Sequence, residues 1–235
     1  MFGFYEIPLN IEKNGISISV EGEGGSLVYR RESPEGSVKK NILAKGGKLL
    51  INPVEPLIKP EELTPYFLVE FSKSVMIEPK AESKIYIKFP VEIGVFIAGE
   101  RHYDILDCVT LMKQKLTLYG DASNGLICKY WLSDVYNSIP QAEPFHEGVI
   151  ELNIINTTSR WIELTKAVFN AYGMKIYYGT DRVSMRANLR ILGENFAEID
   201  FIDAPIKSGM EKSLEHYTVR RMSVLTTKFV MEMGL

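Results

Sequence analysis

Apolar and polar residues alternate with a period of two along most of the chain, which is typical of strands with one buried face. The longest such run, 85–97, has an apolar residue at every second position and a proline, Pro90, near its middle. A helix would mix the two sets of residues on each of its faces, so the run is extended. Because proline cannot donate a backbone hydrogen bond to a neighbouring strand, we expect Pro90 to divide the run into two strands.

A first hairpin is predicted near the N-terminus. Asn14-Gly15 separates the alternating runs 5–11 and 16–20, and this dipeptide favours a two-residue turn with positive φ at both positions. Pro8 lacks a backbone donor, so the first run should lie at the edge of a sheet or carry a bulge.

A second hairpin, within 183–202, can be predicted with its register. A three-residue loop after the first strand opposes Leu189 to Ile199 and Arg190 to Glu198. In that register the apolar faces of the two strands agree, whereas a shift by one residue would mismatch them. Asn195 would then take the left-handed conformation that such loops commonly need.

The remaining elements are mostly strands. Further strands are predicted at 26–31, 67–71, 74–78, 115–119, 126–132, 149–155, 175–179 and 227–232. The segment 159–172 fits either a helix or a strand, and we favour a strand because its neighbours are strands. One short helix is predicted near 209–218, where Ser208 and Glu211 have the spacing of a capping box.

These elements predict an all-β fold of antiparallel, sandwich-like sheets in one or two units, with one short helix near the C-terminus. The segment 137–148 contains two prolines and little periodicity, which marks it as the best internal boundary. It separates a sandwich-like N-terminal unit at 1–136 from a β-rich C-terminal unit at 149–235. The two units can also pack as one domain.

The composition narrows the class of protein without indicating an activity. The 235 residues are 46% hydrophobic and 24% charged, with a formal net charge of -3. The charge argues against a nucleic-acid partner, and the chain lacks the run of about twenty apolar residues that a membrane-spanning helix needs. Cys108 and Cys128, together with the absence of a signal peptide, predict a cytoplasmic protein. The low glutamine content resembles that of thermophile proteins.

Two histidine segments could supply a metal or acid–base site. His102 and Asp104 project to the same face if their segment is extended. Glu143, His146 and Glu147 lie together in the predicted linker, where they could form a second such site. A solvated strand end and a polar linker explain the two sets structurally, and we expect no bound metal or cofactor.

The most suggestive surface is a row of arginines next to two tyrosines. Its members are Arg182, Arg186, Arg190, Tyr177 and Tyr178. Such a face can bind a protein or a glycan through forked hydrogen bonds and stacking. The alternative, which we favour, is that the arginines pair across the sheet with Glu198 and Asp200.

Four stretches of the sequence together resemble a family of uncharacterised archaeal proteins that carry a domain of unknown function. They are Met1-Phe2-Gly3, 89–92, 174–178 and 228–235. The resemblance runs along the whole chain and implies an archaeal, cytoplasmic origin. It implies no active site, because none is established for that family.

The sequence therefore favours a non-catalytic binding or protein-interaction module with a protein or glycan partner. The alternative is a hydrolase or metal-dependent enzyme that uses one of the two histidine segments. A third hypothesis, a nucleic-acid binder that uses the arginines, would require salt-sensitive binding. Exposed edge strands would also allow a homodimer.

Overall fold

The computed structural model describes residues 2–23, 25–44, 46–57, 63–99, 102–215 and 228–235. In this part of the chain almost all regular structure is β, and the helical element is one short turn, η1 (Ala171–Gly173). The strands form four sheets. The predicted all-β, sandwich-like fold is confirmed. Within the described residues, the structure contains no helix long and apolar enough to cross a membrane.

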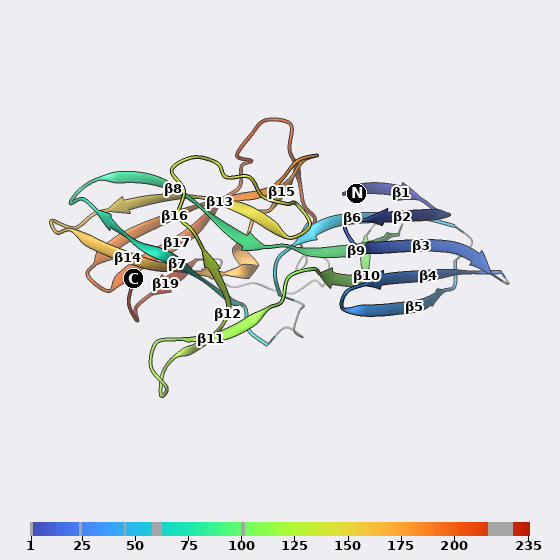
Figure 1. Ribbon diagram of the computed structural model, residues 1–235, viewed down its shortest axis with the longest axis horizontal. Helices are drawn as coiled ribbons and strands as arrows, with labels where there is room; N and C mark the ends of the chain where they lie inside the picture. The colour runs from blue at the N-terminus through green and yellow to red at the C-terminus, as the bar shows by residue number, and fades with distance from the viewer. Residues whose placement is uncertain (1, 24, 45, 58–62, 100–101, 216–227) are drawn as a thin grey trace.

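The first two sheets form a sandwich at the N-terminal end (Figure 1). One has the antiparallel order β1–β6–β9–β10 and the other the order β2–β3–β4–β5. Their strands are β1 (Gly3–Glu6), β2 (Leu9–Lys13), β3 (Ile16–Glu23), β4 (Ser26–Ser33), β5 (Gly36–Ile42), β6 (Lys48–Val54), β9 (Glu92–Ala98) and β10 (Tyr103–Thr110). Buried residues of both sheets, such as Ile18 and Ile51, belong to one continuous core.

The other two sheets form a second sandwich. One has the order β11–β12–β7–β14, and β12 runs parallel to β7. In the other, β8 pairs with β13, β13 runs parallel to β16, and both β15 and β17 pair with β16. Their strands are β7 (Tyr66–Ile77), β8 (Glu82–Pro90), β11 (Lys115–Tyr119), β12 (Leu126–Ser133), β13 (Glu147–Asn156), β14 (Ile162–Asn170), β15 (Tyr177–Tyr178), β16 (Val183–Gly193), β17 (Phe196–Ile202), β18 (Glu211–Lys212) and β19 (Phe229–Met231).

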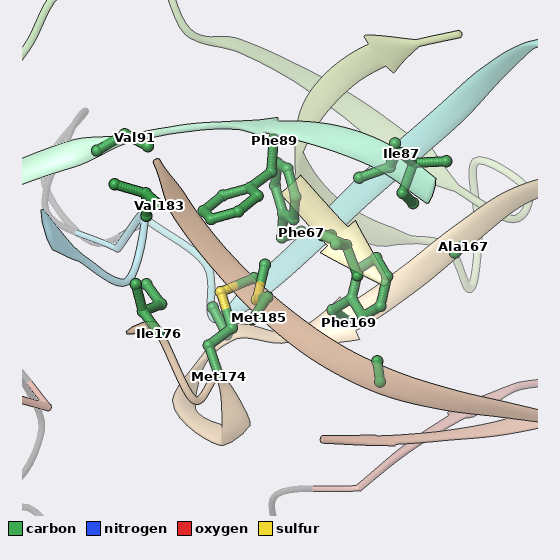
Figure 2. Close-up of a cluster of buried hydrophobic side chains, with 14 of the residues drawn as sticks. Phe67, Ile87, Phe89, Val91, Ala167, Phe169, Met174, Ile176, Val183 and Met185 are labelled. Carbon is green, nitrogen blue, oxygen red and sulfur yellow. The ribbon is translucent and has the colours of Figure 1, made fainter. Parts of the chain in front are cut away.

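The core of the second sandwich brings together aromatic and sulfur-containing side chains from both of its sheets. Phe67 and Phe169 come from the first sheet, and Phe89 and Met185 come from the second (Figure 2). All four are fully buried or nearly so. Because Met is unbranched and adaptable, Met185 can fill the irregular space between the rings.

The long alternating run is divided at Pro90, as predicted. β8 ends at Pro90 and β9 begins at Glu92, and the two strands belong to different sandwiches. Strand pairing does not follow the predicted boundary at 137–148. β7 and β8 precede this segment and pair with β14 and β13, which follow it. Local proline content could not reveal this, because the pairing joins strands that are far apart in the sequence.

Both predicted hairpins are present. Asn14 and Gly15 have φ values of 51° and 78° and join β2 to β3. Arg190 lies opposite Glu198, which is the predicted register. The predicted left-handed conformation of Asn195 is wrong, because its φ is not positive. The extra residue is instead accommodated by a bulge between Ile191 and Gly193.

The predictions for two other segments had opposite outcomes. The ambiguous segment 159–172 is a strand, β14, followed by the turn η1, so the favoured interpretation is confirmed. The predicted helix near 209–218 is wrong over 209–215, where Glu211 and Lys212 form β18. These two residues pair with β15, and this backbone pairing replaces the capping box. Residues 216–218 of the prediction lie outside the described part of the chain.

Candidate functional site

Two cavities next to β15 share Asp181 and Arg182, and we call them together the Arg182 groove. The first cavity has a volume of about 480 Å³ and is lined by residues of both sandwiches. Phe2, Gly3 and Lys13 come from the first sandwich, and 144–145, 178–182 and 207–211 come from the second. The second cavity, of about 450 Å³, is lined by Lys88, 141–143 and Glu147 as well as by the shared pair.

Three aromatic rings form the floor of the first cavity. The ring of Phe2 lies 5.0 Å from that of Phe145 and 5.5 Å from that of Tyr178, measured between centroids. Phe145 and Tyr178 are almost completely buried, whereas Phe2 is half-buried. The Lys13 ammonium lies 5.3 Å from the centroid of Phe145, within range of a cation–π interaction. These contacts anchor the N-terminal segment on the second sandwich and make the floor rigid.

Charged groups of both signs form the walls of that cavity. The Tyr178 hydroxyl donates to Glu211 Oε2 at 2.9 Å, and burial together with this bond raises the pKa of Tyr178. Arg182 pairs with the exposed Asp181 at 3.2 Å. Lys13 and Lys207 are exposed, and the described contacts give neither a carboxylate partner. The walls therefore hold two ammonium groups that no acidic side chain in the described structure neutralises.

The carboxylates of the second cavity each have a partner. Glu147 Oε2 accepts from Lys88 Nζ at 2.8 Å, and Glu143 Oε1 accepts from Asn14 Nδ2 at 2.6 Å. The Lys88 ammonium also lies 5.9 Å from the centroid of the Tyr136 ring. Both carboxylates therefore accept hydrogen bonds within the protein, and these bonds fix the positions of the two side chains along the groove.

Of the three arginines in the predicted face, Arg182 lines the groove, and Tyr178 of the same face lines it as well. Arg186 Nε donates to Glu151 Oε1 at 2.9 Å, and Tyr86 donates to the other oxygen of Glu151 at 3.2 Å. The predicted partners of the arginines were Glu198 and Asp200, whereas Arg186 bonds to Glu151 on the parallel strand β13. Arg190 is exposed and lies opposite Glu198, toward the far end of β16.

Tyr177, next to the groove, belongs to a separate polar cluster. Its hydroxyl donates to Asp203 Oδ1 at 2.8 Å, and Lys212 Nζ donates to Asp203 Oδ2 at 2.7 Å. These two bonds hold the pKa of the Asp203 carboxyl below its ordinary value, and the Lys212 bond has the larger effect. Tyr177 is thus occupied inside the protein, whereas its neighbour Tyr178 faces the groove.

The two histidine segments lie apart from one another. His102 Nε2 is 3.2 Å from Asp104 Oδ2 at the surface of the first sandwich. The backbone N–H of His146 donates to the Glu143 carbonyl, and its Nδ1 atom is buried without a described partner. In the described part of the chain, the structure brings together no group of three or more His, Cys, Asp or Glu residues that could hold a metal ion.

Two buried ionic clusters were not predicted from the sequence. In the first, Asp107 Oδ2 accepts from Arg31 Nε and from the Tyr29 hydroxyl, each at 2.9 Å. In the second, Glu92 Oε1 accepts from Lys129 Nζ at 3.1 Å, and this bond joins β9 of the first sandwich to β12 of the second. In the sequence, a charged residue within a mainly apolar strand could have indicated these clusters. Glu151 is a charged residue in the same kind of strand.

A family model described as "Protein of unknown function (DUF432)" matches residues 1–232. No curated protein and no solved structure matches the chain.

Proposed function

We propose that this chain, which belongs to the DUF432 family of proteins of unknown function, is a non-catalytic binding module that holds a segment of a partner protein in the Arg182 groove. The proposal is carried by one observation. The groove combines a rigid aromatic floor with two ammonium groups, Lys13 and Lys207, that the described carboxylates leave without a partner.

The charges of the groove favour an acidic ligand. The acids that line it accept hydrogen bonds from Tyr178, Arg182, Lys88 or Asn14. A carboxylate that already accepts a hydrogen bond within the protein gains less from a ligand. An exposed ammonium group, in contrast, can gain a charge-assisted hydrogen bond from a ligand. The complementary ligand therefore carries at least one carboxylate.

The shape of the groove favours a peptide over a glycan. Sugars bind most strongly to aromatic faces that are open to solvent, but Phe145 and Tyr178 are almost completely buried. A peptide can place one apolar side chain against the half-buried ring of Phe2 and continue past Arg182 into the second cavity. The first cavity alone, at about 480 Å³, has the size of an ordinary ligand pocket.

Selection from a library of phage-displayed peptides on the immobilised protein would test the proposal. We expect the enriched peptides to carry Asp or Glu next to an apolar residue. The double variant Lys13→Ala, Lys207→Ala should bind them at least about tenfold more weakly, because two charge-assisted bonds are lost. Lys39→Ala is the matched control, since Lys39 is an exposed lysine on β5, outside the groove.

Two results would contradict the proposal. Equal binding of the peptides by the double variant and the wild type would place their site elsewhere. Absence of any enriched peptide, together with binding to immobilised oligosaccharides, would favour a glycan ligand.

We also infer the setting in which the module works. The low glutamine content and the family resemblance support an archaeal, thermophilic source, and two cysteines that form no disulfide support a cytoplasmic location. Fractionation of the source cells with an antibody against the protein would test the location.

A further inference from the structure

Strand β11 presents an apolar edge to solvent. Among the described strands it pairs only with β12, so its outer edge has no strand partner there. Leu116 and Leu118 on this strand are 44% and 43% exposed, and Ile127 on β12 is 55% exposed. Leu118 lies directly opposite Ile127 in the pair, so the three side chains share one face. In Figure 1 the β11–β12 hairpin extends away from the body of the protein.

Other sheet edges in the described structure are protected in ways that β11 is not. The edge strand β5 carries two exposed lysines, Lys39 and Lys40, and charged side chains of this kind discourage pairing with another chain. The edge of β8 is covered, because the backbone of Tyr86 exchanges hydrogen bonds with that of Tyr136. β11 instead carries its one lysine, the exposed Lys115, at its first position, and it presents the exposed leucines Leu116 and Leu118 along a free edge.

We propose that β11 pairs in antiparallel fashion with β11 of a second copy of this chain, about a two-fold axis at Thr117. Thr117 is the central residue of the five-residue strand, so this register pairs the full length of both strands. Leu116 of each copy then lies opposite Leu118 of the other, and Lys115 lies opposite Tyr119. The two sheets join into one continuous sheet across the axis.

The sequence around β11 is complementary to itself in this register. The exposed Lys113 lies two residues before the strand, and the exposed Asp121 lies two residues after it. Antiparallel pairing about Thr117 brings Lys113 of each copy toward Asp121 of the other, at both ends of the interface. Opposite charges therefore meet at the ends and leucines meet in the centre, which favours this register over a shifted one.

The interface would also reduce the exposure of the leucines on β11. Leu116 and Leu118 of one copy lie beside Leu118 and Leu116 of the other along the join, so these side chains pack against one another across it. None of these residues lines the Arg182 groove. The dimer and the proposed peptide site are therefore independent, and either can fail without the other.

Light scattering with size-exclusion chromatography on the full chain is the first test. We expect twice the monomer mass of 26.7 kDa at high micromolar concentration. Leu116→Lys with Leu118→Lys should weaken dimerisation at least about tenfold, because apolar burial is lost and like charges meet in the interface. Circular dichroism of this variant should match the wild type, since both positions are at the surface.

A cysteine cross-link tests the register. Thr117→Cys places the two thiols opposite each other on the axis, so mild oxidation should produce a covalent dimer. Lys115→Cys is the matched control on the same strand. Its two copies would lie roughly 13 Å apart along the strands, which is too far for a disulfide. Because Cys128 lies directly opposite Thr117 on β12, both cysteine variants are made in a Cys128→Ala background, so that Thr117→Cys cannot form a disulfide within one chain.

Three outcomes would overturn the proposal. The first is a monomeric wild type at high micromolar concentration. The second is a dimer that the two lysine substitutions leave unchanged. The third is cross-linking of Lys115→Cys as efficient as that of Thr117→Cys, because it would show pairing in another register or random collision.

Discussion

The first sandwich and the Arg182 groove use the same three kinds of side chain in opposite ways. In the sandwich, Tyr29 and Arg31 both bond to Asp107, and the Arg31 and Asp107 side chains are only 3% and 8% exposed. In the groove, Tyr178 bonds to Glu211 and Arg182 pairs with Asp181, but Asp181 is 64% exposed. We call the first set the Asp107 cluster.

The difference indicates which of the two sets holds the fold together. Arg31 also donates to Ser33 Oγ and to the Gly36 carbonyl, so its guanidinium is satisfied inside the protein. Asp107 also accepts from the backbone of Cys108. The polar groups of the Asp107 cluster are buried and already hydrogen-bonded within the protein, so they are not available to a ligand. The Arg182 groove, in contrast, has exposed charged groups. Function is therefore expected at the groove and stability at the Asp107 cluster.

The largest effect should come from breaking the Asp107 cluster. Asp107→Ala leaves the Arg31 guanidinium buried without its carboxylate, and we expect a loss of about 3–5 kcal/mol in the free energy of unfolding. Urea denaturation would measure it. Replacing both partners, Arg31→Met with Asp107→Leu, should recover much of that loss because no buried charge remains. A loss under about 1 kcal/mol for Asp107→Ala would show that the cluster is not structural.

Arg182, which directly precedes β16, and Arg186, within β16, provide a smaller, matched contrast. Arg186 bonds to the buried carboxylate of Glu151, so Arg186→Ala should cost about 1.5–3 kcal/mol in unfolding free energy. Among the described contacts the Arg182 side chain, which is 16% exposed, pairs with Asp181, which is 64% exposed. The solvent screens such a pair, so Arg182→Ala should cost less than Arg186→Ala, about 0.5–1 kcal/mol. Thermal denaturation of the two variants side by side would distinguish them. Equal losses would remove the distinction between structural and groove arginines.

The last comparison concerns the tyrosines, whose substitution should act mainly at alkaline pH. Tyr29→Phe removes one hydrogen bond, which contributes about 1 kcal/mol to the free energy of unfolding. It should also change how this free energy depends on pH above neutrality. Burial, and then the Asp107 charge, hold the pKa of Tyr29 far above its ordinary value of 10.0. The folded protein keeps this proton above pH 10 while the unfolded chain loses it, so the stability present below pH 10 is lost as pH rises.

Urea denaturation between pH 9 and 11 would measure this linkage. Tyr29→Phe should lose stability less steeply than the wild type above pH 10, because the linked proton is gone. Tyr178→Phe is the comparison from the groove. Its pKa is also raised by burial and by the bond to Glu211, so Tyr178→Phe should flatten the slope in the same way. Identical slopes for the wild type and Tyr29→Phe would show that Tyr29 does not titrate differently in the two states.

Several features of the fold were predictable because they depend on neighbours in the sequence. The turn at Asn14-Gly15 and the division of the long run at Pro90 follow from backbone chemistry alone. The register that places Arg190 opposite Glu198 follows from matching two apolar faces across a short loop. The helix near 209–218 failed on its described part because a capping box is a local preference. Pairing of Glu211 and Lys212 with β15 competes with it through tertiary contacts.

The sequence by itself thus determined most of the strands and two of the hairpins, since period two and turn chemistry act over a few residues. The strands β5, β6 and β10 were not predicted. Only the tertiary structure decided the parallel pairs β7–β12 and β13–β16, which gave Arg186 its partner Glu151. It also assembled the Arg182 groove from segments near Phe2, Phe145, Arg182 and Lys207. Such pairings carry no local signal, because their free energy comes from burying surfaces of strands that are distant in the sequence.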